Sequence, residues 1–219
     1  MYGMRVCVVT GQAERLPECD VALFGFGRLG DVDYESELSG KSEKLEEAAR
    51  LSAVCGCCTV CGCTTFSRGA VRKSAAVSEK GKLLGISDMT HVFGGESYKS
   101  GANMGIYFTE GGKVGVCVEN DIFFPEAVRA LCTCGCNLIV AVMEQSRDGM
   151  PPLLARAYAY LFGVPVVMCA GKTAFFAETG GGIATSTHPV TLFETNPAVG
   201  CRLVTTRLKG VAEDGRADY

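Results

Sequence analysis

The chain has 219 residues, a formal net charge of −3, a pI near 5.5 and a mean hydropathy of +0.20. This length suits one well-filled core without a linker, so we expect a single domain over residues 1–210 and a flexible, charged tail over 211–219. The acidic balance argues against a nucleic-acid partner, and the apolar runs are too short to span a membrane.

The amino terminus has neither a basic stretch before an apolar core nor a lipidation box, so we expect a cytoplasmic protein. Basic residues gather over 68–82, but apolar and acidic residues separate them, which favours a solvated face.

Strands and helices alternate along the chain. Helical spacing of Leu45, Ala48 and Ala49 supports the first helix, and Pro152 suits the first turn of the third. Interleaving of this kind predicts helices packed on a mixed sheet. In chain order the patterns predict strands at 4–10 and 20–26, a helix at 41–55, strands at 57–66, 70–78, 82–88, 105–108 and 113–118, a helix at 124–135, a strand at 137–142, a helix at 151–162, and strands at 164–170, 174–179, 182–187, 190–194 and 201–207.

The segment 115–126 carries the most informative motif. It ends a predicted strand with the order Asp-x-x-Phe-Pro-Glu, formed by Asp121, Phe124, Pro125 and Glu126. This frame resembles the nucleophile motif Cys-x-Asp-x-x-Phe-Pro-Glu of the nitrilase, or carbon-nitrogen hydrolase, superfamily. Glu119 stands where the resemblance places the nucleophilic cysteine.

The other two catalytic positions implied by the resemblance are also substituted. The segment 20–26 matches the strand that carries the family's general base, and Phe26 stands in place of that glutamate. The segment 81–92 matches the one that carries the lysine, and Met89 stands in its place. Attack on an amide or nitrile carbon needs a thiolate, a proton-accepting carboxylate and a donor for the developing anion. Phe26, Met89 and Glu119 do not supply that set.

The resemblance extends over most of the chain and implies an α-β-β-α sandwich. One departure lies between the first two strands, where residues 12–17 are too few for the helix that the family places there. We therefore expect a sandwich shortened at the amino end by one helix. The deletion exposes one flank of the sheet, which must be covered by a partner or by the helix at 41–55, or consist of residues that tolerate solvent.

Several neighbours of the substituted triad remain candidates for chemistry. Glu96 matches an auxiliary glutamate of the family, which implies that Glu96 and Glu119 share a cavity without a cation and that one pKa is raised. His91 matches a family histidine that holds structure, with acid–base work as the alternative. Asp121 is expected to bond backbone. Cys117 could restore a nucleophile only through a bulge, so a core cysteine is favoured.

Thirteen cysteines, most of them within 55–63 and 132–136, leave three interpretations. A zinc or iron-sulfur site would use such thiolates, and redox pairing is the third option. We favour small buried hydrophobic residues, because both stretches fall on strands or helix ends. We therefore predict no metal and no cofactor.

Two functions stay open, so the sequence does not decide whether the chain is an enzyme. The first is a binding or assembly module that has lost thiol-dependent hydrolysis and takes a small amide-like or carboxylated ligand or a protein partner. The alternative is an active hydrolase or lyase that uses Glu119, Glu96 and His91. Family members pair through helices like those at 124–135 and 151–162, so the resemblance also implies a homodimer, with Tyr158, Tyr160, Leu161 and Phe162 at the interface.

Overall fold

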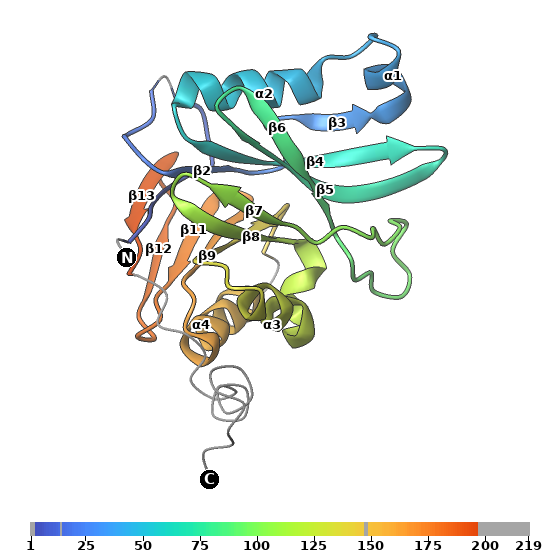
Figure 1. The fold of residues 1–219 in the computed structure, drawn as a ribbon. Helices are drawn as coiled ribbons and strands as arrows, with labels where there is room; N and C mark the ends of the chain where they lie inside the picture. The colour runs from blue at the N-terminus through green and yellow to red at the C-terminus, as the bar shows by residue number, and fades with distance from the viewer. Residues whose placement is uncertain (1–2, 14, 147–148, 197–219) are drawn as a thin grey trace, which may run out of the picture.

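The computed structural model describes residues 3–13, 15–146 and 149–196 (Figure 1). The predicted strand at 201–207 and the tail at 211–219 lie outside these residues. In chain order the elements are β1 (Arg5–Val9), β2 (Val21–Phe24), β3 (Gly30–Asp33), α1 (Tyr34–Leu38), α2 (Lys44–Cys55), β4 (Cys58–Ser67), β5 (Ala70–Glu79), β6 (Lys82–Asp88), β7 (Ile106–Thr109), β8 (Gly112–Val118), the 3-10 helix η1 (Glu119–Phe123), α3 (Pro125–Thr133), β9 (Leu138–Met143), α4 (Met150–Phe162), β10 (Val166–Ala170), β11 (Thr173–Ala177), β12 (Ile183–Ser186) and β13 (Val190–Glu194).

The strands form two mixed sheets. The first has the order β13-β1-β2-β4-β5-β6, with β3 also paired to β4, and the second has the order β12-β11-β10-β9-β8-β7. Strands β1, β2 and β4 run parallel in the first sheet, and β8, β9 and β10 run parallel in the second. Parallel neighbours end at the same edge, so the residues after β8 and β9 come together.

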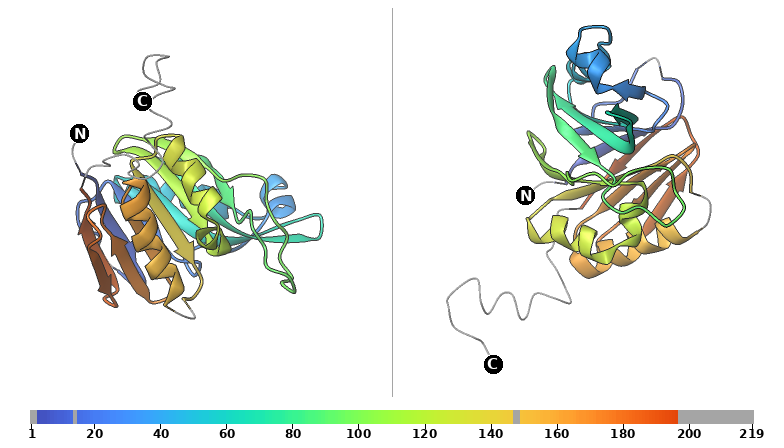
Figure 2. Two further views of the ribbon diagram at one scale, coloured as in Figure 1. Left: turned by 90° about the horizontal axis from the view of Figure 1, so that it is seen from below. Right: turned by 90° about the vertical axis from the view of Figure 1, so that its right-hand side faces the viewer.

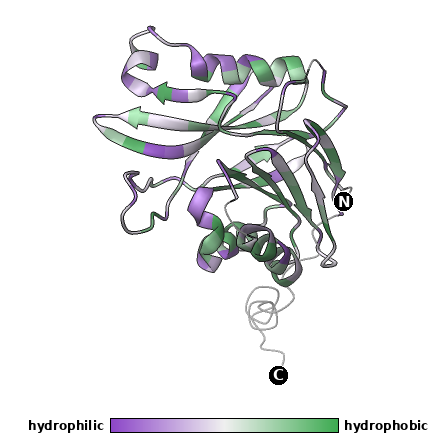
Figure 3. Cartoon of the chain, turned by 180° about the vertical axis from the view of Figure 1, so that it is seen from behind, coloured by the Kyte–Doolittle hydropathy of each residue, from purple (hydrophilic) through white to green (hydrophobic). Residues whose placement is uncertain are grey.

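The two sheets pack face to face between helices, which confirms the expected α-β-β-α sandwich (Figure 1). The strands in the middle of the molecule are mainly hydrophobic (Figure 3). Alternation decides the faces of each strand: in β1, Val6 and Val8 point between the sheets, whereas Cys7 and Val9 point outward. Helices α3 and α4 lie side by side on the outer face of the second sheet (Figure 2).

The first sheet is covered less completely. The described residues between β1 and β2 contain no helix, as expected for the shortened sandwich. Helix α2 covers part of the outer face and buries Ala48, Ala49 and Ser52. None of the helices in the described part of the chain is long and apolar enough to cross a membrane. Strand β3 and the short helix α1 were not predicted, because residues 30–38 lack a clear apolar period.

Gly62 sets how the chain leaves β2. Strand β4 pairs with β2 through residues 58–61 and with β3 through residues 63–66, so Gly62 lies where the partner changes. A Cβ atom there would lie 3.0 Å from the backbone nitrogen of Phe26 and 2.7 Å from Val142 Cγ1. Only glycine lets the backbone after β2 pass this closely, and that passage places Phe26 between the sheets.

Candidate functional site

Glu119 lies at the turn that follows β8. Its φ of +49° is in the left-handed region, which a residue with a side chain adopts at a cost of about 1–3 kcal/mol. The chain continues as η1, and α3 then starts with Pro125 in its first turn, a position where the fixed φ of proline suits a helix. The chain is thus strained at the residue that the resemblance matches to the nucleophile position.

The surviving motif frame joins two segments of the chain. The fully buried carboxylate of Asp121 accepts hydrogen bonds from the backbone N–H groups of Thr90 and His91, both at 3.0 Å. His91 Nδ1 lies 2.9 Å from the same oxygen, and the His91 ring stacks on Phe124 with centroids 4.0 Å apart. Asp121 therefore bonds backbone, as predicted, and fixes the segment after β6 against the turn after β8.

Phe26 and Met89 fill the inside of the sandwich. Their exposures are 8% and 1%, and both belong to the cluster between the sheets. The backbone of Met89 is held on both sides: its N–H donates to the carbonyl of Lys73 and its carbonyl accepts from Gly101, each at 2.8 Å. Neither side chain can take or donate a proton.

Lys73 supplies a cation that the sequence pattern did not predict. It lies on β5 with the same parity as Ala75 and Val77, so its side chain points between the sheets, where it is 6% exposed. The Nζ atom lies 4.7 Å from the ring centroid of Phe26 and 5.0 Å from that of Tyr98. The prediction of a solvated basic face over 68–82 was therefore wrong at Lys73.

An ion pair connects Lys73 to the second sheet. Lys73 Nζ lies 2.9 Å from Glu144 Oε2 and 3.5 Å from Thr64 Oγ1 on β4. Burial alone would lower the pKa of Lys73, but Glu144 and Tyr98 more than offset it and hold the pKa above its ordinary value. Lys73 is therefore a charged ammonium in a largely apolar setting, partnered by a carboxylate that is 57% exposed.

Glu119 adjoins this pair through the backbone. The N–H of Glu144, the residue after β9, donates to Glu119 Oε1 at 2.6 Å. Burial raises the pKa of Glu119 to about 7, which this hydrogen bond and Lys73 oppose and the charges of Glu144 and Glu96 reinforce. At neutral pH Glu119 is thus divided between its acid and its carboxylate, which suits proton exchange.

Glu96 lies at the rim of the site. It is exposed, and its Oε2 atom accepts from Asn120 Nδ2 at 2.8 Å and from the N–H of Phe93 at 3.2 Å. Glu96 thus influences Glu119 through its charge but does not share a buried cavity with it, and Lys73 provides the cation that the expected pair lacked.

Cys117 lies on the other side of the second sheet. It is 1% exposed in the cluster beneath α3 and α4, and burial raises its pKa well above the usual value. The backbone turns at Glu119, where φ is positive, so the side chains of Cys117 and Glu119 point in different directions. The core-cysteine interpretation of Cys117 is consistent with this position.

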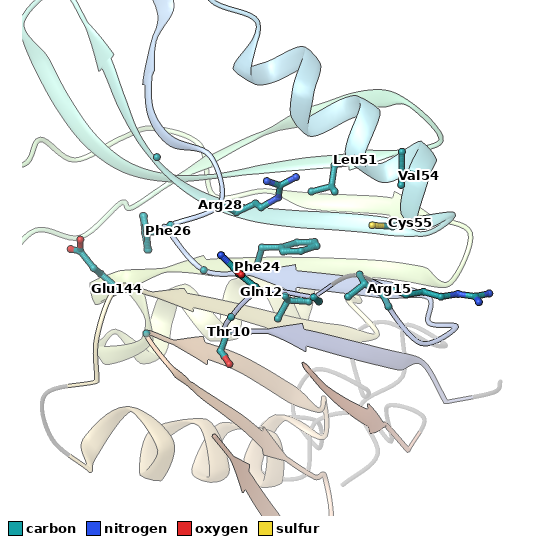
Figure 4. A pocket seen from close by; sticks show the side chains of 18 of the residues that line it. Thr10, Gln12, Arg15, Phe24, Phe26, Arg28, Leu51, Val54, Cys55 and Glu144 are labelled. Carbon is teal, nitrogen blue, oxygen red and sulfur yellow. The ribbon is translucent and has the colours of Figure 1, made fainter. Parts of the chain in front are cut away.

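A groove of about 1560 Å³ reaches the site from the flank of the first sheet. It runs between the β1–β2 connection and the last turn of α2, where the resemblance places the missing helix. Phe26 and Glu144 lie at one end, and Val54 and Cys55 lie towards the other (Figure 4). Thr64 also lines the groove, which therefore gives a ligand access to the partners of Lys73.

The cysteines of 55–63 are mainly core residues. Cys58 points between the sheets, and Cys57, Cys61 and Cys63 are buried under α2. Cys136 is buried too, whereas Cys134 is exposed. Among the residues that the structure describes, no three His, Cys, Asp or Glu side chains are arranged to hold a metal ion.

The chain is similar to known proteins in sequence and in fold. The family model "Carbon-nitrogen hydrolase" matches residues 16–189. No curated protein sequence is significantly similar.

Solved structures share the fold at low sequence identity. The Nit3 protein of Saccharomyces cerevisiae, a member of branch 10 of the nitrilase superfamily, is 15% identical with a TM-score of 0.72, covering 100% of this chain and 97% of that one. A carbon-nitrogen hydrolase from Helicobacter pylori is 13% identical with a TM-score of 0.70, covering 89% and 90%. An amidase from Nesterenkonia sp. is 14% identical with a TM-score of 0.68, covering 90% and 91%.

Proposed function

Because the chain belongs to the carbon-nitrogen hydrolase family, we propose that it is a member without thiol-dependent hydrolysis that binds a small amide or carboxylate. The observation that supports this proposal is the ion pair between the buried Lys73 and the half-exposed Glu144 beside Glu119. Phe26 and Met89, which the resemblance matches to the family's base and lysine, pack between the sheets. The site offers a cation and a proton-sharing carboxyl group but no thiolate, since Cys117 is buried elsewhere.

The ion pair can open to a ligand at low cost. Glu144 is 57% exposed, so its carboxylate can return to water, whereas Lys73 is 6% exposed and needs an acceptor. A ligand carbonyl or carboxylate oxygen can take the place of Glu144 on Lys73. Glu119 then donates to the ligand when protonated or accepts from an amide N–H when ionised.

The test uses butyramide and butyrate as probes, since a mutant of the Nesterenkonia amidase has been crystallised with butyramide. We expect binding by calorimetry to wild type and a loss of at least about tenfold in Lys73→Met, which keeps the length of the side chain but removes its charge. Lys82→Met, on the exposed start of β6, is the matched control and should bind as wild type does. Equal binding by both variants would contradict the proposed role of Lys73.

The second candidate is an active hydrolase or lyase. The pKa of Glu119 near 7 and its strained backbone favour it, because both are features of groups poised for acid–base work. Glu96 and His91 are the other residues that this alternative uses.

The two functions separate in a screen of amides, nitriles and esters. Under the binding proposal, neither wild type nor Glu119→Gln turns over any of these compounds. Turnover that is present in wild type and lost in a folded Glu119→Gln variant would establish the enzyme instead.

A further inference from the structure

Four cysteines gather at one edge of the first sheet. Cys7 lies in β1, Cys19 precedes β2, Cys55 ends α2 and Cys57 precedes β4. Cys7, Cys19 and Cys57 belong to the cluster under α2, and Cys55 is half-buried against it. Cys55 also lines the groove (Figure 4).

The strand pairing brings Cys19 and Cys57 together. Strands β2 and β4 are parallel neighbours with Val21 opposite Cys58, and the N–H of Cys58 donates to the carbonyl of Asp20 at 3.1 Å. The residues just before each strand therefore leave the sheet at the same edge. The two Sγ atoms lie 3.7 Å apart, in direct contact but not bonded.

The surroundings favour a thiolate at Cys19. Hydrogen bonding to Cys57 and Cys7 lowers the pKa of Cys19 against the effect of burial, and the guanidinium of Arg5 adds to this. The Arg5 guanidinium is paired with the two residues that flank Cys19, Glu18 at 3.1 Å and Asp20 at 3.9 Å. A thiolate next to a protonated thiol is the arrangement in which one sulfur attacks and the other resolves.

We propose that Cys19 and Cys57 form a reversible disulfide, with a low-molecular-weight disulfide such as oxidised glutathione as the oxidant. The Cys19 thiolate attacks one sulfur of the oxidant, forms a mixed disulfide and releases a glutathione thiolate. That thiolate takes the proton of Cys57, whose sulfur then attacks Cys19 Sγ and releases the second glutathione thiolate, which takes a proton from solvent. The two cysteines are oxidised by two electrons, and the oxidant is reduced to two thiols.

Other chemistry fits these residues less well. Cys61 and Cys63 lie deeper on the same face, where burial raises the pKa of both thiols and makes them poor nucleophiles. The described side chains include no group arranged as a metal site. Thiol–disulfide exchange needs two neighbouring sulfur atoms, and Cys19 and Cys57 provide them at 3.7 Å.

The disulfide would restrain one wall of the groove. The β1–β2 connection forms one wall of the groove and contains no helix among its described residues, so little regular structure holds it. A bond between Cys19 and Cys57 ties the end of this connection to the start of β4. The bond can form whichever ligand the groove receives.

The experiment maps disulfides in folded protein. Wild type is incubated with oxidised glutathione, alkylated, and digested with trypsin without reduction. Cleavage puts Cys19 on residues 16–28 and Cys57 on residues 51–68, which also hold Cys55, Cys58, Cys61 and Cys63. We expect a linked pair of these peptides, the loss of two free thiols from wild type, and full reversal by dithiothreitol.

Two serine variants in the same peptide locate the partner. Cys57→Ser should lose the link and accumulate glutathione on Cys19, whereas Cys55→Ser should keep the link. A link that persists in Cys57→Ser would overturn the proposal, as would stoichiometric zinc in the purified protein. Absence of the linked peptides from oxidised wild type, with an unchanged circular dichroism spectrum, would overturn it even if a variant failed to fold.

Discussion

Two features of Glu119 destabilise the folded chain at neutral pH. Its backbone is left-handed, and burial makes its carboxyl group hard to ionise. Below about pH 4.5 this residue is protonated in both the folded and the unfolded chain. As pH rises towards 7 the unfolded chain loses the proton first, so the folded state becomes progressively less stable relative to it. A pKa raised from 4.5 to about 7 corresponds to about 3 kcal/mol at most.

Glu119→Gln should remove this pH dependence. Glutamine keeps an oxygen for the N–H of Glu144 and has no proton to lose. We expect its free energy of unfolding in urea to exceed that of wild type by about 1–3 kcal/mol at pH 8 and to approach it at pH 4. Glu126→Gln, at an exposed position in α3, is the control and should follow wild type. A constant difference between Glu119→Gln and wild type across this range would contradict the raised pKa.

At the level of elements, the sequence pattern predicted nearly every strand and helix of the described chain within a few residues, because buried strands are short apolar runs and amphipathic helices have a strong period. The charge pattern of the local sequence misplaced Lys73. Its burial depends on Glu144, 71 residues further along the chain, and on the ring of Phe26, so a lysine beside Arg72 was interpreted as solvated. The parity of Lys73 with Ala75 and Val77 is the signal that points inward.

The crossing at Gly62 can be tested directly. Gly62→Ala should cost about 1–3 kcal/mol in the free energy of unfolding, since its Cβ would lie 2.7 Å from Val142 Cγ1 and 3.0 Å from the Phe26 backbone nitrogen. Displacement of Phe26 should also weaken binding of the probes through Lys73, whose ammonium lies 4.7 Å from the ring. Gly27→Ala meets no atom within 4 Å and should change stability by less than about 1 kcal/mol. Equal effects of the two substitutions on stability would contradict this account.

For the whole molecule, the face that carries α3 and α4 lies opposite the layer that carries α2 (Figure 1). Two of the aromatic residues expected at an interface pack inward instead: Tyr158 is 4% exposed and Phe162 is 7% exposed. Tyr160, at 46%, and Leu153, at 56%, remain on the surface of α4. We therefore propose a homodimer through the outer faces of α3 and α4, formed by these exposed residues.

This arrangement leaves the groove on the α2 side of each subunit open, so assembly and ligand binding should be separable. Leu153→Glu puts a charge on the proposed interface and should weaken dimerisation at least about tenfold in sedimentation velocity at micromolar concentration, with butyramide binding unchanged. Leu38→Glu, on α1 at 89% exposure, is the matched control and should stay dimeric. A monomeric wild type would contradict the proposed dimer. Dissociation by Leu38→Glu alone would show that the interface lies on the α2 side, beside the groove.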